Sequence, residues 1–289
     1  MLRVALAAAT NAGWMEERGP SRTALSVAAL RAVHQRYDAD PKILDDPIAL
    51  RLVPAELMTE LERDPERWQR DDRVALRAQV VVRSRFAEER LSAAAARGVT
   101  QAVSLGAGYD TFAYRQPAWA RGLRIVEIDA PATQRAKRER LAAAGIAIPS
   151  NVAFVPVDFE QTPIAAALAE AIDVTQPAFF SWLGVMMYLR REAVEAVFRA
   201  VAALPRGSEI AFTYTGPRAP DARIEDGAAA LGEPWLTRTT PEELRVLLPR
   251  FGFAEVSLPM PDEIATRYFT GRQDGLLPPR RPSLGAAVV

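Results

Sequence analysis

The sequence predicts an α/β protein whose doubly wound, mostly parallel sheet of seven strands is covered by helices. From residue 101 onward, short β-type runs alternate with longer helical segments, which is typical of a parallel sheet wound on both faces. Glycines follow the first of these runs in Leu105-Gly106-Ala107-Gly108-Tyr109-Asp110-Thr111, and acids end the second run. Because ligands of such sheets bind at the carboxyl ends of the strands, these two features also indicate a binding site.

The elements of the sheet follow from the same alternation. The predicted strands are residues 101–105, 123–128, 152–157, 178–183, 208–214, 253–258 and 285–289, and the helices between them are 130–144, 163–172 and 191–204. Residues 216–251 form a helical insertion between the fifth and sixth strands, with one helix over 242–248 that follows Thr240-Pro241. We expect this insertion to form a lid, because a closed site excludes water.

Helices also precede the sheet, and they predict an N-terminal helical cap over residues 1–72 on a main domain of residues 73–289. Ser21 is a good N-cap for a helix that runs to Tyr37. His34 lies on the apolar stripe of this helix, where a histidine with satisfied hydrogen bonds in the core is the expected interpretation.

The rest of the predicted cap consists of short elements. The run Ile43-Leu44-Asp45-Asp46-Pro47 predicts a turn that caps a short helix over residues 48–52, and a second helix covers 54–61. Residues 62–72 are dense in charge and predict a solvated connection. The apolar run over residues 2–9 lacks the flanks of a secretion signal, so we expect a cytoplasmic protein.

Composition excludes several classes of function. The chain has 289 residues, enough for one large domain, and its 36 basic and 36 acidic side chains leave no net field to attract nucleic acid or an anionic membrane. It has no cysteine, which excludes thiolate metal sites, and its single histidine argues against a histidine-based metal site, so no metal is predicted. No apolar run reaches transmembrane length. The predicted partner is therefore a small molecule, while the oligomeric state stays open.

The glycine turn indicates which cofactor the site binds. A dinucleotide fingerprint reads G-x-G-x-x-G, but Thr111 stands at the third glycine position and Asp110 precedes it. An acid beside the turn repels a pyrophosphate and suits a ligand that carries an amine and a sulfonium. The turn therefore favours S-adenosyl-L-methionine over NAD, with an ordinary tight αβ turn as the alternative. Gly106 and Gly108 would let the backbone approach the ligand closely.

Acids at the strand ends supply partners for a nucleoside. Glu127 and Asp129 end the second predicted strand, where a carboxylate can accept both ribose hydroxyls. Asp158 and Phe159 end the third, where the acid can accept the adenine amino hydrogens and the ring can cover the base. The alternative for Asp158 is a helix cap, because Thr162-Pro163 starts a helix soon after.

Arg83 occupies an unusual position in a long helix predicted over residues 73–97, which ends before Gly98. The face that carries it is otherwise apolar and consists of Leu76, Val80, Arg83, Ala87 and Leu91. A buried guanidinium needs a carboxylate partner. The methionyl carboxylate of the cofactor and an internal ion pair are the two candidates, and spacing alone does not separate them.

Four segments together carry a family resemblance. Pro20-Ser21-Arg22-Thr23-Ala24, Ile43-Leu44-Asp45-Asp46-Pro47, the glycine turn, and Val126-Glu127-Ile128-Asp129-Ala130-Pro131 occur in this order. With them the chain resembles the leucine carboxyl methyltransferase-like family of class I S-adenosyl-L-methionine-dependent methyltransferases, which includes polyketide carboxyl O-methyltransferases. The later segment Gly184-Val185-Met186-Met187-Tyr188-Leu189 is similar to a family motif that follows the fourth strand.

The resemblance implies a Rossmann-like methyltransferase fold and a role for each matching residue. Arg83 would hold the methionyl carboxylate, Asp129 with help from Glu127 the ribose, and Asp158 with Phe159 the adenine. One position departs from the pattern. Leu183 stands where the family usually has a glutamate next to the cofactor, which removes a polar contact near the reacting end.

The acceptor follows from what the chain lacks. A carboxylate is already ionised at neutral pH and needs no general base, whereas a phenol or an amine does, and His34 is the only histidine. The sequence thus favours O-methylation of a small carboxylate. A non-catalytic S-adenosyl-L-methionine-binding protein and a nicotinamide-dependent oxidoreductase are the alternatives.

Overall fold

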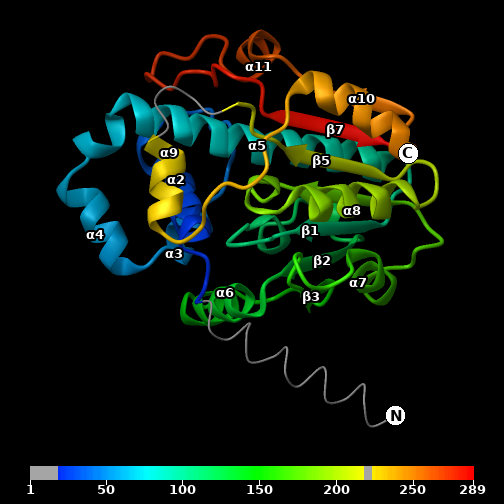
Figure 1. The fold of residues 1–289 in the computed structure, drawn as a ribbon. Coiled ribbons are helices and arrows are strands. Elements are labelled where there is room, and N and C mark those ends of the chain that lie inside the picture. The colour runs from blue at the N-terminus through cyan, green and yellow to red at the C-terminus, as the bar shows by residue number, and fades with distance from the viewer. Residues whose placement is uncertain (1–18, 218–222) are drawn as a thin grey trace.

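The computed structural model describes residues 19–217 and 223–289 of the chain (Figure 1). The apolar run over residues 2–9 and the start of the predicted cap lie outside these residues. Within the described ranges, no helix combines the length and the apolarity that crossing a bilayer requires.

A seven-stranded sheet forms the centre of the described chain, with the order β3-β2-β1-β4-β5-β7-β6. Its strands are β1 (Gln101–Leu105), β2 (Arg124–Asp129), β3 (Val152–Pro156), β4 (Ala178–Trp182), β5 (Glu209–Thr213), β6 (Glu255–Ser257) and β7 (Leu284–Val288). Neighbouring strands from β3 to β5 pair in parallel, whereas β7 runs antiparallel to β5 and β6. The predicted fold class is confirmed, and each predicted strand is found within a few residues of its expected bounds.

Helices cover both faces of the sheet (Figure 1). The α-helices are α2 (Arg22–Tyr37), α3 (Ala49–Leu52), α4 (Ala55–Arg63), α5 (Asp71–Ala96), α6 (Pro131–Ala143), α7 (Ile164–Ala171), α8 (Arg191–Ala202), α9 (Arg223–Ala230), α10 (Pro241–Phe251) and α11 (Pro261–Tyr268). Short 3₁₀ helices are η1 (Glu66–Gln69), η2 (Phe112–Tyr114), η3 (Ala118–Ala120) and η4 (Met186–Tyr188). Helix α11 was not predicted, because Ile264 is its one buried residue and it shows no apolar stripe.

The two-residue repeat of the strands builds two apolar layers. Val103 and Val126 point into the layer shared with α7, α8 and α10, whereas their neighbours Ala102 and Ile125 point into the layer beneath α5. In the first layer the Phe198 ring meets other aromatic rings edge-on, with centroids 5.2–5.4 Å apart. The sheet is therefore rigid on both sides, and its strand ends are fixed points for a site.

Two expectations about the covering segments need correction. In the insertion, α10 follows Thr240 as predicted and has a capping box there, but its Leu244 and Leu248 pack into the core beside α8. Only the earlier part of the insertion, including α9, lines the cavity described below. The charged stretch over residues 62–72 is not wholly solvated, because Trp68 is only 7% exposed and α5 already begins at Asp71.

Candidate active site

A cavity of about 1430 Å³ opens at the carboxyl ends of β1, β2 and β4, between α2, α5 and α9. Pockets for one small molecule measure about 300–1,000 Å³, so this cavity has room for a cofactor and an acceptor together. Seven of the eight residues predicted to bind the cofactor line it: Arg83, Gly106, Gly108, Asp110, Asp129, Asp158 and Phe159.

The glycine turn brings the backbone to the cavity wall, as its two glycines require. Gly106 has φ +67°, and a Cβ at this position would lie 2.3 Å from the Cγ2 atom of Val185. Gly108 also has positive φ, at +48°. Larger residues would be strained at both positions, and at Gly106 a side chain would also collide with the wall.

The acids at the strand ends are each oriented by hydrogen bonds from main-chain N–H groups. Asp129 accepts hydrogen bonds from the N–H groups of Gly108 and Ala130, and the second is 2.6 Å long. Asp110 and Asp158 accept from the N–H groups two residues ahead, each at 2.9 Å. Burial raises the pKa of Asp129, while these main-chain bonds oppose the rise. All three carboxyl groups are thus fixed at the cavity lining.

Glu127 is the exception among the predicted residues, because its side chain does not line this cavity. It is 2% exposed, ion-paired with Lys137 at 2.7 Å, and accepts a hydrogen bond from the Tyr114 hydroxyl at 3.0 Å. Glu127 points to the same face as Ile125, beneath α5, and it lies two residues deeper in β2 than Asp129, which ends the strand. A direct contact between Glu127 and a ligand is therefore withdrawn, and Asp129 is retained.

Arg83 points into the cavity without a protein carboxylate. Among the residues that the structure describes, no acidic side chain forms an ion pair or hydrogen bond with it, so the internal ion pair considered above is not found there. Burial, and next the charge of Arg31, lower the pKa of Arg83 from 12.5 to about 10. Its guanidinium lies against Gly184, where an added Cβ would be 2.7 Å from Nη1. A buried guanidinium with no described acidic partner is well suited to bind an anionic ligand.

The buried carboxylate of Asp46 ties the glycine turn to the N-terminal helices. It accepts hydrogen bonds from the Arg31 guanidinium at 3.0 Å, the Thr111 hydroxyl at 2.7 Å and the Ala49 N–H at 3.1 Å. Arg115 lies 3.5 Å from its other oxygen. The Thr111 hydroxyl thus has a structural role at the position where a dinucleotide fingerprint has its third glycine. The predicted cap of the short helix is confirmed.

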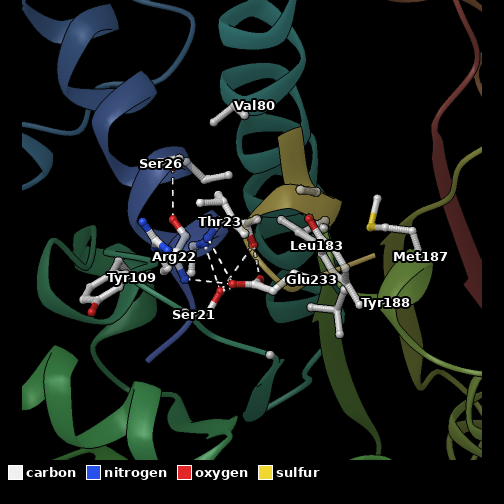
Figure 2. Close-up of a pocket in the computed structure, with 18 of the residues that line it drawn as sticks. Ser21, Arg22, Thr23, Ser26, Val80, Tyr109, Leu183, Met187, Tyr188 and Glu233 are labelled. Carbon is white, nitrogen blue, oxygen red and sulfur yellow. Dashed lines mark hydrogen bonds between the residues drawn. The ribbon is translucent and has the colours of Figure 1, made fainter. Parts of the chain in front are cut away.

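A latch formed by Glu233 joins the insertion to the start of α2 (Figure 2). Its carboxylate accepts from the Ser21 hydroxyl at 3.0 Å, the Arg22 N–H at 2.8 Å, and both the N–H and the hydroxyl of Thr23. Sequence reasoning missed this residue, because more than 200 positions separate it from its partners. A lone Gly-Glu-Pro turn gives no signal of such a contact.

His34 belongs to the core, as the sequence predicted. It is fully buried, and its Nδ1 lies 2.7 Å from Asp38, which also binds the Arg77 guanidinium. The Leu44 N–H donates to Nε2, which places the ring proton on Nδ1. His34 does not line the cavity and is not available to a substrate there.

The other half of the cavity is mostly apolar. Tyr188, Met187 and Leu183 form one wall beyond β4 (Figure 2). Other apolar residues face it from α2, α5 and the insertion: Val27, Leu30, Leu76, Val80, Ala228, Leu231 and Trp235. Among the described lining residues there is no histidine, lysine or cysteine. This half can hold an apolar acceptor but offers few proton-accepting groups.

The fold and this site define the class of the protein. A glycine turn after β1, an acid after β2 and an antiparallel β7 between β5 and β6 form a methyltransferase-like α/β architecture. A solved candidate methyltransferase from Thermobifida fusca shares it at 20% identity, with a TM-score of 0.57 over 93% of this chain and 95% of that one. A solved Streptomyces avermitilis protein of the DUF574 family is 19% identical, with a TM-score of 0.54 over 82% of this chain and 91% of that one.

The chain belongs to the leucine carboxyl methyltransferase family, whose model matches residues 24–202. YktD of Bacillus subtilis, a candidate S-adenosyl-L-methionine-dependent methyltransferase, is 32% identical over 91% of this chain and 95% of its own length. A protein of Mycobacterium marinum with the same description is 36% identical, over 66% of this chain and 65% of that protein.

Proposed function

We propose that this methyltransferase uses S-adenosyl-L-methionine to methylate a carboxylate of an apolar small molecule. Its family and its relatives are the basis for the methyl donor. The observation that supports a carboxylate acceptor is the cavity lining, which in its described part contains no histidine, lysine or cysteine. A carboxylate is an acceptor that needs no general base.

The residues present fit the methyl donor. The unpaired Arg83 guanidinium would bind the methionyl carboxylate, Asp129 the ribose hydroxyls, and Asp158 with Phe159 the adenine. Gly106 would allow the backbone to lie against the ligand, since no Cβ fits there. When bound, the donor supplies a methyl group on a sulfonium, which leaves as a neutral thioether.

The chain's own contribution is positioning. Leu183, Met187 and Tyr188 form an apolar wall that would hold the acceptor in line and keep water out. A carboxylate oxygen forms the new bond to the methyl carbon as the carbon–sulfur bond breaks, and no proton is transferred. A phenol, with a pKa of about 10, would first have to lose its proton to a base.

Isotope-labelled methyl transfer tests this proposal. The purified protein is incubated with methyl-labelled donor and matched pairs of acceptors that share a skeleton and differ in carrying a carboxyl or a hydroxyl group. We expect label in the acids only, and its release as methanol under mild alkali, which hydrolyses a methyl ester but not an ether. Label in the hydroxyl compounds that survives alkali would refute carboxyl methylation. Cofactor binding without any transfer would favour a non-catalytic role.

A further inference from the structure

The face that α5 turns toward the cavity has a cation at each end. Arg73, Leu76, Val80 and Arg83 all line the cavity, at spacings of three, four and three residues. These spacings place them on one side of a helix, and the ten residues from first to last correspond to about 15 Å along its axis. An apolar stretch thus separates the two arginines.

Arg73, like Arg83, has no acidic partner in the part of the chain that the structure describes. Among the described residues, no carboxylate lies within ion-pair distance of its guanidinium, which is half-buried and 5.8 Å from the centre of the Trp68 ring. The exposed Arg67 lies over the same ring at 5.9 Å. Nearby acids do not neutralise the charges of Arg73 and Arg67. Asp72 lies 3.9 Å from Arg70, and among the described residues the exposed Glu60 forms no ion pair with Arg73 or Arg67.

Trp68 gives this end of the cavity a fixed base. Its side chain is 7% exposed and packs with Leu30, Val33 and Val80 between α2 and α5. Within the described part of the chain, its indole N–H has no hydrogen-bond partner. A guanidinium held against a buried indole is ordered before a ligand arrives, which lowers the entropy cost of binding an anion.

We propose that Arg73, supported on Trp68, forms a second anion subsite, so that the acceptor is an elongated molecule with an apolar body and an anionic group at each end. One end is the carboxylate that is methylated beside Tyr188. The other is a carboxylate or phosphate bound by Arg73 and by Arg67 at the rim. This inference rests on the proposed function for the reacting end alone; the subsite itself is tested by binding.

Binding to the complex with S-adenosylhomocysteine separates the subsite from the chemistry. Calorimetry compares dodecanedioate, which carries a carboxylate at each end of an apolar chain, with dodecanoate, which carries only one. A charge-assisted contact predicts that the dianion binds about 10- to 100-fold more tightly. An ω-phosphono acid of similar length then shows whether the subsite prefers carboxylate or phosphate.

Substitutions at two positions of the same helix, Arg73 and Arg85, provide the test and its control. Arg73→Gln should abolish the preference for the dianion while dodecanoate binding stays unchanged, and Arg73→Lys should restore part of it. Arg85→Gln removes an arginine from the exposed face of α5, where it pairs with Glu89 at 2.7 Å, and should leave the preference intact. Circular dichroism checks that every variant is folded.

The outcomes distinguish the two proposals. Equal binding of both acids, no measurable binding of the dianion, or a preference that survives in Arg73→Gln would overturn the subsite. If the preference depends on Arg73 but neither acid accepts a methyl group, the subsite stands and carboxyl methylation of such acids fails. If both acids become esters with equal efficiency and affinity, methylation stands and the subsite fails.

Discussion

Replacing Arg83 with methionine tests whether this arginine binds the cofactor or instead stabilises the fold. Methionine keeps most of the apolar stem but removes the charged guanidinium. A structural arginine in a buried ion pair would cost about 3–5 kcal/mol of unfolding free energy when removed, because its partner would be left unpaired. Arg83 has no such partner among the described residues, so this loss is not expected.

The sign of the stability change follows from the pKa. Burial lowers the pKa of Arg83 from 12.5 to about 10, so at pH 7 it is protonated in both the folded and the unfolded chain, and the folded state bears the full cost of burying the charge. That cost disappears only as the pH rises through about 10. The shift sets an upper limit of about 3 kcal/mol, and contact with cavity water reduces it. Arg83→Met should therefore leave the unfolding free energy unchanged or raise it slightly.

Cofactor affinity should change in the opposite direction. Loss of a charge-assisted contact costs about 1.5–3 kcal/mol, which weakens the Kd for S-adenosylhomocysteine by about 10- to 150-fold. Calorimetry measures the affinity and urea denaturation measures the stability. Arg85→Met, on the exposed face, is the control and should change neither by much. A loss of 3 kcal/mol or more in stability with an unchanged Kd would refute the reasoning.

Three further changes test the elements around this arginine. Gly184→Ala and Gly145→Ala both place alanine at positive φ, at +73° and +62°, and each should cost about 1–2 kcal/mol of unfolding free energy. Only at Gly184 would the added Cβ meet the Arg83 guanidinium, so only Gly184→Ala should also weaken cofactor binding in calorimetry. Asp46→Asn should lower the unfolding free energy, measured by urea denaturation, by about 3–5 kcal/mol, because several buried donors lose their charged acceptor. Asp45→Asn, at an exposed position, should have little effect. Burial raises the pKa of Asp129 above 3.8, so cofactor affinity should begin to fall at a higher pH than the protonation of an ordinary aspartate would cause. Calorimetry at several pH values should find this dependence in the original protein and not in Asp129→Asn.

The sheet and the strand-end acids could be predicted because local patterns determine them. Alternating burial and breaker residues locate the strands, and parallel pairing brings their carboxyl ends to one edge. Alternation could not separate Glu127 from Asp129, because residues two apart along a strand point to the same face, so only their distance from the end of β2 distinguishes them. Strand ends are uncertain by a residue or two from sequence, and that uncertainty decides which acid reaches the cavity.

Other features depend on contacts between distant segments and had no local signal. Trp68 lies in a charged stretch, and it is buried only because α2 and α5 pack over it. The absence of an acidic partner for Arg83 is a property of the assembled cavity. The sequence could show that this arginine interrupts an apolar face, but it could not distinguish a protein carboxylate from that of a ligand.

Helix α2 explains why the N-terminal motif and the glycine turn occur in one protein. At its start, Ser21 and Thr23 hold the carboxylate of Glu233 from the insertion, and near its middle Arg31 holds Asp46, which in turn holds the glycine turn. One helix therefore fixes both the cofactor side and the covering side of the cavity. The two attachments differ in strength, because the Asp46 network is buried and charged whereas the Glu233 latch is partly exposed to water. When the insertion opens to admit an acceptor, the latch should break first and leave the glycine turn in place.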